Sequence, residues 1–235
     1  MEHGLLDGKS LLDGKRSRVH IVVTYLLIIS FAIIGTFYLL FGLTEVTGES
    51  MENTIFGGNQ VFLLKHGYSL ERGDIVTFNV GSKKEPHDLI KRVIAVSGDK
   101  VLYVRDKSKA YVDLYLCKSG DTAFRYVDEP YIKERMRYSF FSQYRINVLN
   151  DVDRKTIESI DITKSASGYT ETVRQAIIDA AINVPQKHFY FLGDNRNVSR
   201  DSRHYGTRNY SCIYGKMLIN VIKDSKKYKI LNFIF

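Results

Sequence analysis

The longest apolar stretch of the chain runs over residues 21–42, where 22 consecutive positions carry no charged side chain. Its clearly polar members are three hydroxyl residues, Thr24, Ser30 and Thr36. At about 1.5 Å of rise per residue, a helix of this length reaches roughly 33 Å, which matches the hydrocarbon core of a bilayer. The stretch is longer than the apolar region of a cleaved signal peptide, and no small-x-small cleavage site follows it. We therefore predict an uncleaved transmembrane anchor over residues 21–42.

The basic residues around this anchor are unevenly distributed. Four precede it: Lys9, Lys15, Arg16 and Arg18. After it, no lysine or arginine occurs before Lys65. Because short basic flanks stay on the cytoplasmic side, we expect residues 1–20 to form a flexible cytoplasmic tail and the remainder of the chain to be extracytoplasmic. The pattern predicts a single-pass protein of the cell membrane.

Beyond residue 42 the pattern changes to short runs of branched and aromatic residues, each bounded by Gly, Asp, Asn or Lys. Such runs are typical of β-strands joined by tight turns. Six of them are clear, and they cover residues 61–66, 74–80, 89–96, 100–105, 187–192 and 215–222. The fold class predicted for this part of the chain is mostly β.

One stretch has helical spacing instead, over residues 170–185. Its apolar positions recur every three or four residues, at Val173, Ala176, Ile177, Ala180 and Ala181. Thr170 is the expected N-cap, and Pro185 lies just past the end. The helix falls in a polar region without dense strand signals, residues 133–184, which we interpret as an insertion or small subdomain. It divides the predicted β core into residues 43–132 and 185–235.

Composition narrows the classes of partner. The net charge is +8, but the basic residues are scattered and form no helix-turn-helix, zinc-finger or RNA-binding signature. We therefore expect no nucleic-acid partner. Cys117 and Cys212 lie 95 positions apart without a Cys-x-x-Cys motif, so no metal site is predicted, and the sequence leaves open whether they form a disulfide.

Candidate chemistry begins with the polar run GDNRNVSRDSR at residues 193–203, directly after the apolar run 187–192. Alone, such a run often makes only a turn. Two further features accompany it. Ser50 comes eight positions after the anchor, and Lys91 lies at the centre of the apolar run 89–96.

Together these features resemble the bacterial type I signal peptidase (leader peptidase) family, membrane proteases with a Ser-Lys dyad. The matching segments occur in the family's order: GESMENT, RGDIVTF, LIKRVIAVSGDKV, DEPYIKE and FLGDNRNVSRDSRHYG. The resemblance implies a membrane-anchored antiparallel β domain, with one N-terminal transmembrane helix and a short helix in the insertion. It also implies a serine endopeptidase that removes signal peptides from exported precursors. Its partners would be those signal peptides and membrane lipid, with no cofactor or metal.

The chemistry of such a pair makes a demand on the lysine. A serine hydroxyl needs a base beside it, and lysine can serve only when its pKa falls by roughly two to three units. Burial has this effect, because it disfavours the ammonium form. The apolar neighbours of Lys91 suit this purpose, and alternation along the strand predicts that Arg92 points outward. The alternative for Lys91 is an ordinary edge or snorkelling lysine.

The resemblance assigns the roles residue by residue. Ser50 would be the nucleophile and Lys91 its base. Ser199 matches the position that holds the lysine amine, while Asp201 and Arg203 match a structural pair, whose alternative is a weak surface ion pair. The oxyanion would be stabilised by the backbone N–H of the nucleophile.

Three residues near the nucleophile raise further expectations. Met51 could line a shallow substrate pocket for small side chains, or pack in the core. Gly48 lacks the hydroxyl that some family members add to the oxyanion site. Asn53 replaces the proline of the family's usual Ser-Met-x-Pro-Thr, so we expect the loop to survive with less preorganisation.

Two other functions stay open. One is a catalytically impaired or non-enzymatic membrane-anchored homologue that acts in the assembly of surface structures, which Asn53 favours. The other is a peptidase dedicated to one pilus or conjugation system, which the polar insertion favours. A self-cleaving repressor with a related core is excluded, because residues 1–46 hold an anchor instead of a DNA-binding head.

Overall fold

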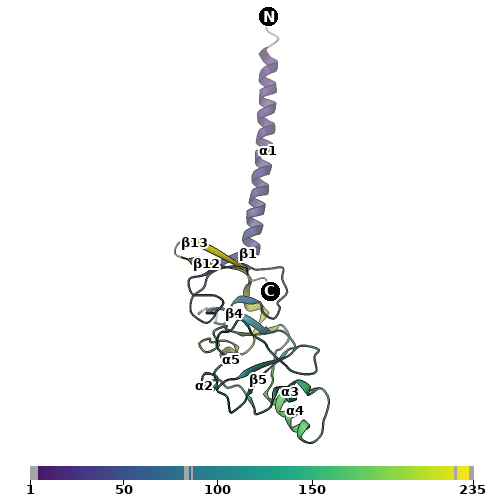
Figure 1. Cartoon of the computed structure of the whole chain (residues 1–235). Helices are drawn as coiled ribbons and strands as arrows, with labels where there is room; N and C mark the ends of the chain where they lie inside the picture. Colours follow the sequence, from purple (N-terminus) through teal and green to yellow (C-terminus); the bar gives the residue numbers. More distant parts are fainter. Residues whose placement is uncertain (1–4, 82–84, 86, 225–226, 233–235) are drawn as a thin grey trace. The chain divides into compact units, whose positions relative to one another are not determined.

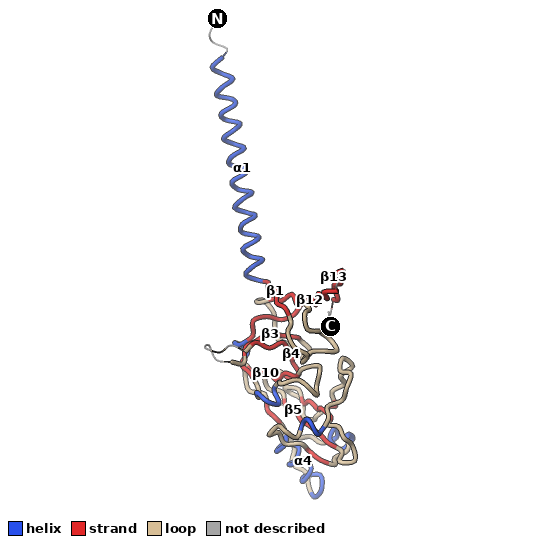
Figure 2. The backbone as a smooth tube through the Cα atoms, turned by 90° about the vertical axis from the view of Figure 1, so that its left-hand side faces the viewer, coloured by secondary structure: helices blue, strands red, loops and turns tan. Residues whose placement is uncertain are grey.

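The computed structural model of the chain describes residues 5–81, 85, 87–224 and 227–232. Two compact units make up the chain, Met1–Gly42 and Leu43–Phe235. The first contains the helix α1 (Leu5–Leu40), which Figure 2 shows as one continuous blue coil. Its segment Arg18–Leu40 is long and apolar enough to cross a membrane.

The helix differs from the expected anchor at both ends. It stops at Leu40 because the next residues form the strand β1 (Phe41–Glu45), so the predicted end at residue 42 was two residues too late. It also begins at Leu5, so most of the expected flexible tail is helical. This segment contains no proline, although Gly8 and Gly14 lie within it. The three hydroxyl side chains of the apolar stretch each donate a hydrogen bond to a carbonyl three or four residues earlier, which satisfies them without water.

The second unit is built on two sheets, which confirms the mostly β fold. The larger sheet has the order β1-β2-β12-β3-β4-β10-β11, with β13 paired to β12. Its other strands are β2 (Gln60–Leu64), β3 (Ile75–Asn79), β4 (Asp88–Ala95), β10 (His188–Leu192), β11 (Arg208–Asn209), β12 (Ile213–Asp224) and β13 (Lys227–Asn232). The pairings whose registers are defined are antiparallel.

The smaller sheet has the order β7-β6-β5-β8, with β9 also paired to β5. Its strands are β5 (Lys100–Arg105), β6 (Asp113–Cys117), β7 (Arg125–Tyr126), β8 (Leu149–Asn150) and β9 (Ile182–Asn183). The short helices are α2 (Tyr138–Phe141), α3 (Arg154–Ser159), α4 (Gly168–Ala180), α5 (Ser202–Tyr205) and the 3-10 turn η1 (Tyr210–Cys212). Figures 1 and 2 show α4 beside β5, at the opposite end of this unit from β12.

The six predicted strands correspond to β2, β3, β4, β5, β10 and β12. The segment interpreted as an insertion, residues 133–184, is more closely integrated than its polarity indicated. It supplies β8 and β9, both of which pair with β5, and its helix α4 buries Val173 and Ile177 in the core of that sheet. The interpretation as a separate piece missed these pairings, because two-residue strands carry no periodic signal of their own.

The helix α4 is confirmed in place but starts earlier than predicted. Thr170 lies inside it, and Ser167 occupies the cap position. The carboxylate of Glu171 accepts a hydrogen bond from the N–H of Ala166 at 2.8 Å, which stabilises a start before Thr170. The helix ends at Ala180, ahead of the proline that was expected to mark its end.

Aromatic packing holds β3, β4 and β10 together. Phe78, Phe189 and Phe191 are fully buried, and Phe78 meets the other two rings edge-on at centroid distances of 5.1 and 4.5 Å. Such pairs add about 0.5–1.5 kcal/mol beyond the burial of their area. Val93 of β4 belongs to the same cluster. The strand that carries Lys91 therefore has a fixed position in the sheet.

Candidate active site

Lys91 occupies the centre of β4, and the register of the sheet decides what surrounds it. Lys91 pairs with Val76 of β3, and Arg92 pairs with Leu192 at the end of β10. The polar loop, residues 193–203, therefore leaves the sheet directly beside these two cations. Lys91 is only 2% exposed, and a lysine is rarely so buried without a partner.

The partner of Lys91 is Ser50. Lys91 Nζ lies 2.5 Å from Ser50 Oγ, and it donates a hydrogen bond to the carbonyl oxygen of Ile90 at 2.9 Å. Burial removes water from the ammonium and lowers the pKa of Lys91 from 10.5 to about 8, although the charges of Asp201 and Asp194 oppose this. A lysine with such a pKa is partly neutral at pH 7 and can accept a hydroxyl proton.

Ser50 lies in a tight loop, residues 48–55, which we call the Ser50 loop. The N–H groups of Thr54 and Ile55 both donate to the carbonyl oxygen of Met51, at 3.0 and 2.9 Å. Met51, the residue after Ser50, is thus hydrogen-bonded to the last two residues of the loop. Backbone hydrogen bonds of this kind hold a short loop in one conformation without help from a strand or a helix.

Asn195 of the polar loop holds the Ser50 loop from outside. Its backbone N–H donates to the carbonyl oxygen of Ser50, and its side-chain amide donates to that of Glu49, both at 3.1 Å. Because the peptide bond is planar and trans, the N–H of Ser50 points opposite to the Glu49 carbonyl. The contact with Asn195 therefore fixes the direction of the Ser50 N–H. Nothing in the polar run distinguished Asn195 from its neighbours before this contact was seen.

Met51 is buried, with 1% of its surface exposed. It packs in a cluster that includes Ile55, Ile75 and Ile90. This arrangement corresponds to core packing, one of the two alternatives that its sequence position left open. A role for Met51 in a substrate pocket stays a prediction.

Arg92 departs from the expectation that one cation lies inside and the other points outward. It is 2% exposed, and its guanidinium donates to both carboxylate oxygens of Asp194, at 2.9 and 2.7 Å. A third hydrogen bond reaches the carbonyl of Gly73 at 2.9 Å, and the ring of Tyr131 lies 4.0 Å from the guanidinium carbon. The outward-pointing prediction was wrong because other parts of the chain cover the face of β4 on which Arg92 lies.

Asp201 and Arg203 form a buried ion pair rather than a surface pair. Both side chains are fully buried, and the Arg203 guanidinium donates to both oxygens of Asp201 at 2.8 Å. Although burial alone would raise the pKa of Asp201, the Arg203 charge and the hydrogen bonds hold it below its usual value. Asp201 also caps α5 and accepts a hydrogen bond from the N–H of Gly193 at 3.1 Å, which ties the two ends of the polar loop together.

Ser199 is fully buried, but it makes no hydrogen bond to Lys91 of the kind that the resemblance implied. Among the described residues, its Oγ has no hydrogen-bond partner, while its N–H donates to the Asn195 carbonyl at 3.0 Å. Its side chain packs against Gly193, where an added Cβ would overlap both Ser199 Oγ and the carbonyl oxygen of Ser50. The site therefore requires glycine at position 193. In the sequence, the only indication of this requirement is that Gly193 lies where the apolar run ends and the polar loop begins.

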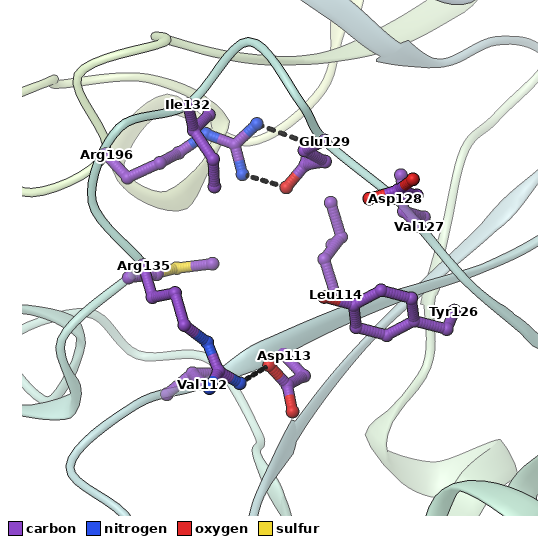
Figure 3. A pocket seen from close by; sticks show the side chains of 11 residues that line it. Val112, Asp113, Leu114, Tyr126, Val127, Asp128, Glu129, Ile132, Arg135 and Arg196 are labelled. Carbon is purple, nitrogen blue, oxygen red and sulfur yellow. Dashed lines mark hydrogen bonds and ion pairs between the residues drawn. The ribbon is translucent and has the colours of Figure 1, made fainter.

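A second buried ion pair joins the polar loop to the segment at residues 128–134. The Arg196 guanidinium donates to both carboxylate oxygens of Glu129, and its Nε donates to the carbonyl of Gly193 at 3.0 Å. Figure 3 shows this pair at the rim of a cavity of about 200 Å³, on the other side of which Arg135 faces Asp113. Both residues lie in segments that match the family's motifs, but the sequence does not indicate that Arg196 and Glu129 form an ion pair.

The described residues form neither a metal-binding cluster nor a disulfide. Within the described ranges, no cluster of three or more His, Cys, Asp or Glu side chains is arranged to hold a metal ion. Cys117 and Cys212 are both free thiols, so the disulfide that the sequence left open is not formed. Burial raises the pKa of both thiols, which makes them poor nucleophiles.

Comparison with known proteins places this geometry in a family. The chain matches the family model described as signal peptidase, peptidase S26, over residues 17–222. It is 30% identical over 175 residues to signal peptidase IB of Staphylococcus aureus, covering 73% of each chain. It is 29% identical over 170 residues to signal peptidase I of Streptococcus pneumoniae, covering 69% of this chain and 73% of that one.

Among solved structures, a signal peptidase I from Enterococcus faecalis is similar at 21% identity, with a TM-score of 0.33. The similarity covers 64% of this chain and 98% of the other. The match to the family model extends from the apolar helix to β12, and so includes Ser50, Lys91 and the polar loop. The chain belongs to the signal peptidase family, peptidase S26, and is a serine peptidase by that membership.

Proposed function

We propose that this protein is a membrane-bound serine endopeptidase that removes signal peptides from exported precursors, with Ser50 as nucleophile and Lys91 as general base. The observation that carries the proposal is the 2.5 Å separation of Lys91 Nζ and Ser50 Oγ, with the lysine buried and its pKa lowered to about 8. These features support both requirements of a Ser-Lys pair, which are contact with the hydroxyl and an amine that is partly neutral near pH 7.

The reaction follows from these two groups. Ser50 gives its proton to Lys91 Nζ while Oγ attacks the scissile carbonyl carbon, which forms a tetrahedral oxyanion. The Lys91 ammonium then protonates the departing amine as the carbon–nitrogen bond breaks, leaving an ester on Ser50. Water then attacks this ester while the neutral amine of Lys91 takes one of its protons. The Lys91 ammonium returns that proton to Ser50 Oγ as the ester bond breaks, which restores the serine and releases the signal peptide as a carboxylic acid that ionises in solvent.

The oxyanion would be stabilised by the backbone N–H of Ser50. Among the described backbone hydrogen bonds none is donated by this N–H, and Asn195 fixes its direction through the Glu49 carbonyl. One such donor is worth about 10²–10³ in kcat in other serine proteases. Gly48 offers no hydroxyl to supplement it.

The substrates would be membrane-inserted precursors with small residues at the third and first positions before the cut, as in signal peptides. The segment Arg18–Leu40 would anchor the enzyme among membrane lipids of the cell membrane. The four basic residues before residue 21 favour a cytoplasmic N-terminus and an extracytoplasmic β domain. The contact between Ser50 and Lys91 supports this enzyme over the non-enzymatic alternative.

The test is cleavage of a synthetic precursor peptide, with Ala at the third and first positions before the expected cut, by full-length protein in detergent. Mass spectrometry would locate the cut. Ser50→Ala and Lys91→Ala should each abolish cleavage. Ser142→Ala and Lys118→Ala, two separate control variants at exposed positions, should each retain it. Retained cleavage in Ser50→Ala would refute the assigned nucleophile, and a folded wild type that leaves the peptide intact would count against the proposed function.

A further inference from the structure

Asn53 has an unusual backbone conformation for its residue type. In the described part of the chain, three residues other than glycine have a positive φ, and that of Asn53 is the largest at 106°. Such angles are rare outside glycine, and Asn is among the few residues that adopt them readily. Asn53 lies three positions after Ser50, within the Ser50 loop.

A turn accounts for this angle. The N–H of Thr54 donates to the carbonyl of Met51 at 3.0 Å, so Asn53 is the third residue of a four-residue turn. In a type II turn the third residue must have a positive φ, which Gly or Asn supplies. Proline holds φ near −65° and cannot occupy that position without changing the turn. The turn begins at Met51, the residue that follows the nucleophile, and its hydrogen bond closes on the Met51 carbonyl.

The side chain of Asn53 connects this turn to the strand of the base. Its amide donates to the backbone carbonyl of Asp194 at 3.3 Å, and the hydroxyl of Thr54 donates to the Asp194 carboxylate. That carboxylate holds Arg92, which directly follows Lys91 in β4. The Ser50 loop and the base strand are thus bridged by one residue of the polar loop.

We propose that Asn53 is a positioning residue, which keeps Ser50 against Lys91 through its left-handed backbone and its hydrogen bond to Asp194. The inference rests on the proposed function of the Ser50–Lys91 pair. The family usually has proline at this position, and the sequence alone indicated that its replacement loosens the loop. In this structure the positive φ of Asn53 restrains the loop instead, and a proline there could not adopt that angle.

Three variants of the full-length protein separate the two contributions. Asn53→Gly keeps the backbone angle and loses only the hydrogen bond from the side-chain amide to Asp194, so we expect kcat to fall about fivefold. Asn53→Ala loses the same hydrogen bond and also strains the backbone, so kcat should fall about 30-fold or more. Asn53→Pro cannot adopt the angle and should lose more than about 100-fold. KM should change little, because Asn53 acts through Ser50.

Lys187 offers a matched control. It too is the third residue of a turn, closed by His188 N–H to the Pro185 carbonyl at 3.1 Å, and its φ is 60°. Lys187→Pro should lower the thermal unfolding temperature, as Asn53→Pro should also do, but leave kcat per folded molecule unchanged. A general loss of stability would therefore affect both variants, whereas mispositioning of the nucleophile would affect only the Asn53 variants.

A second measurement makes the outcome independent of the precursor. Acylation of Ser50 by a small β-lactam, followed by intact mass, should rank the Asn53 variants in the same order. In the wild type its rate should rise with pH to a midpoint near 8, and in Asn53→Pro this midpoint should be lost. If the wild type is acylated but leaves the precursor uncut, the proposed function fails while the ranking still tests Asn53. Wild-type kcat and pH midpoint in Asn53→Pro would overturn the inference, as would a wild type that is not acylated.

Discussion

Replacing Lys91 with methionine should make the protein more stable while it abolishes cleavage. Burial lowers the pKa of Lys91 from 10.5 to about 8, so the folded state disfavours the ammonium. At about 1.4 kcal/mol per unit, the folded protein at pH 7 is less stable by about 3 kcal/mol than with a neutral side chain there. Methionine is unbranched and of similar length, so it can fill the space without a charge.

The pH dependence distinguishes this cause from better packing. Between about pH 8 and pH 10.5 the unfolded chain binds the proton of Lys91 more tightly than the folded chain does, so the free energy of unfolding of the wild type rises with pH. The advantage of Lys91→Met should therefore be largest below pH 8 and shrink toward pH 10.5.

The assay is denaturant unfolding of the full-length protein in detergent at pH 7 and pH 10, for the wild type and Lys91→Met. Lys118→Met, which replaces an exposed lysine, is the control and should change stability by less than about 0.5 kcal/mol at both pH values. If Lys91→Met were less stable than the wild type at pH 7, or its advantage were the same at both pH values, the reasoning from burial would be refuted.

Three further predictions follow from the same contacts. The kcat/KM of the wild type should rise about tenfold per pH unit up to pH 8 and then level. Lys91→Arg should be inactive across this range because arginine stays protonated. A wild-type kcat/KM that does not change with pH would contradict the assigned base. Gly193→Ala should lower kcat by about 100-fold or more in the peptide assay, because its Cβ would displace the Ser50 carbonyl, and unchanged activity would show that the overlap is relieved elsewhere. Arg92→Met should lower the free energy of unfolding by about 3–5 kcal/mol, because it leaves the buried Asp194 charge unpaired; adding Asp194→Leu should recover much of this loss, and a loss below about 1 kcal/mol would rule out a buried pair.

The structure also shows which contacts a pattern along the chain could not identify. Arg92 was expected in solvent because side chains alternate in a strand, but alternation says nothing of what covers the second face. Here Asp194 and Tyr131 cover it. Asp201 and Arg203, only two positions apart, were expected as a pair, but the pair is completely buried, and the rings of Phe140 and Tyr144, both distant in sequence, lie against Arg203.

The sequence by itself determined the features that depend on neighbours along the chain. These are the apolar helix, the six strands with clear alternation, the helix α4, and the motifs that resemble the signal peptidase family. Each rests on a local period or on a local residue pattern, and such signals do not need the fold to be known.

Only the tertiary structure decided which of these residues meet. It placed Ser50 Oγ beside Lys91 Nζ, left Ser199 Oγ without the expected hydrogen bond, and paired β5 with two short strands from residues 133–184. It also gave Asn53 a turn in which proline would not fit. The physical reason is the same in each case. Contacts between residues tens of positions apart depend on strand register, loop closure and burial, and these are properties of the whole packed domain rather than of any one stretch of sequence.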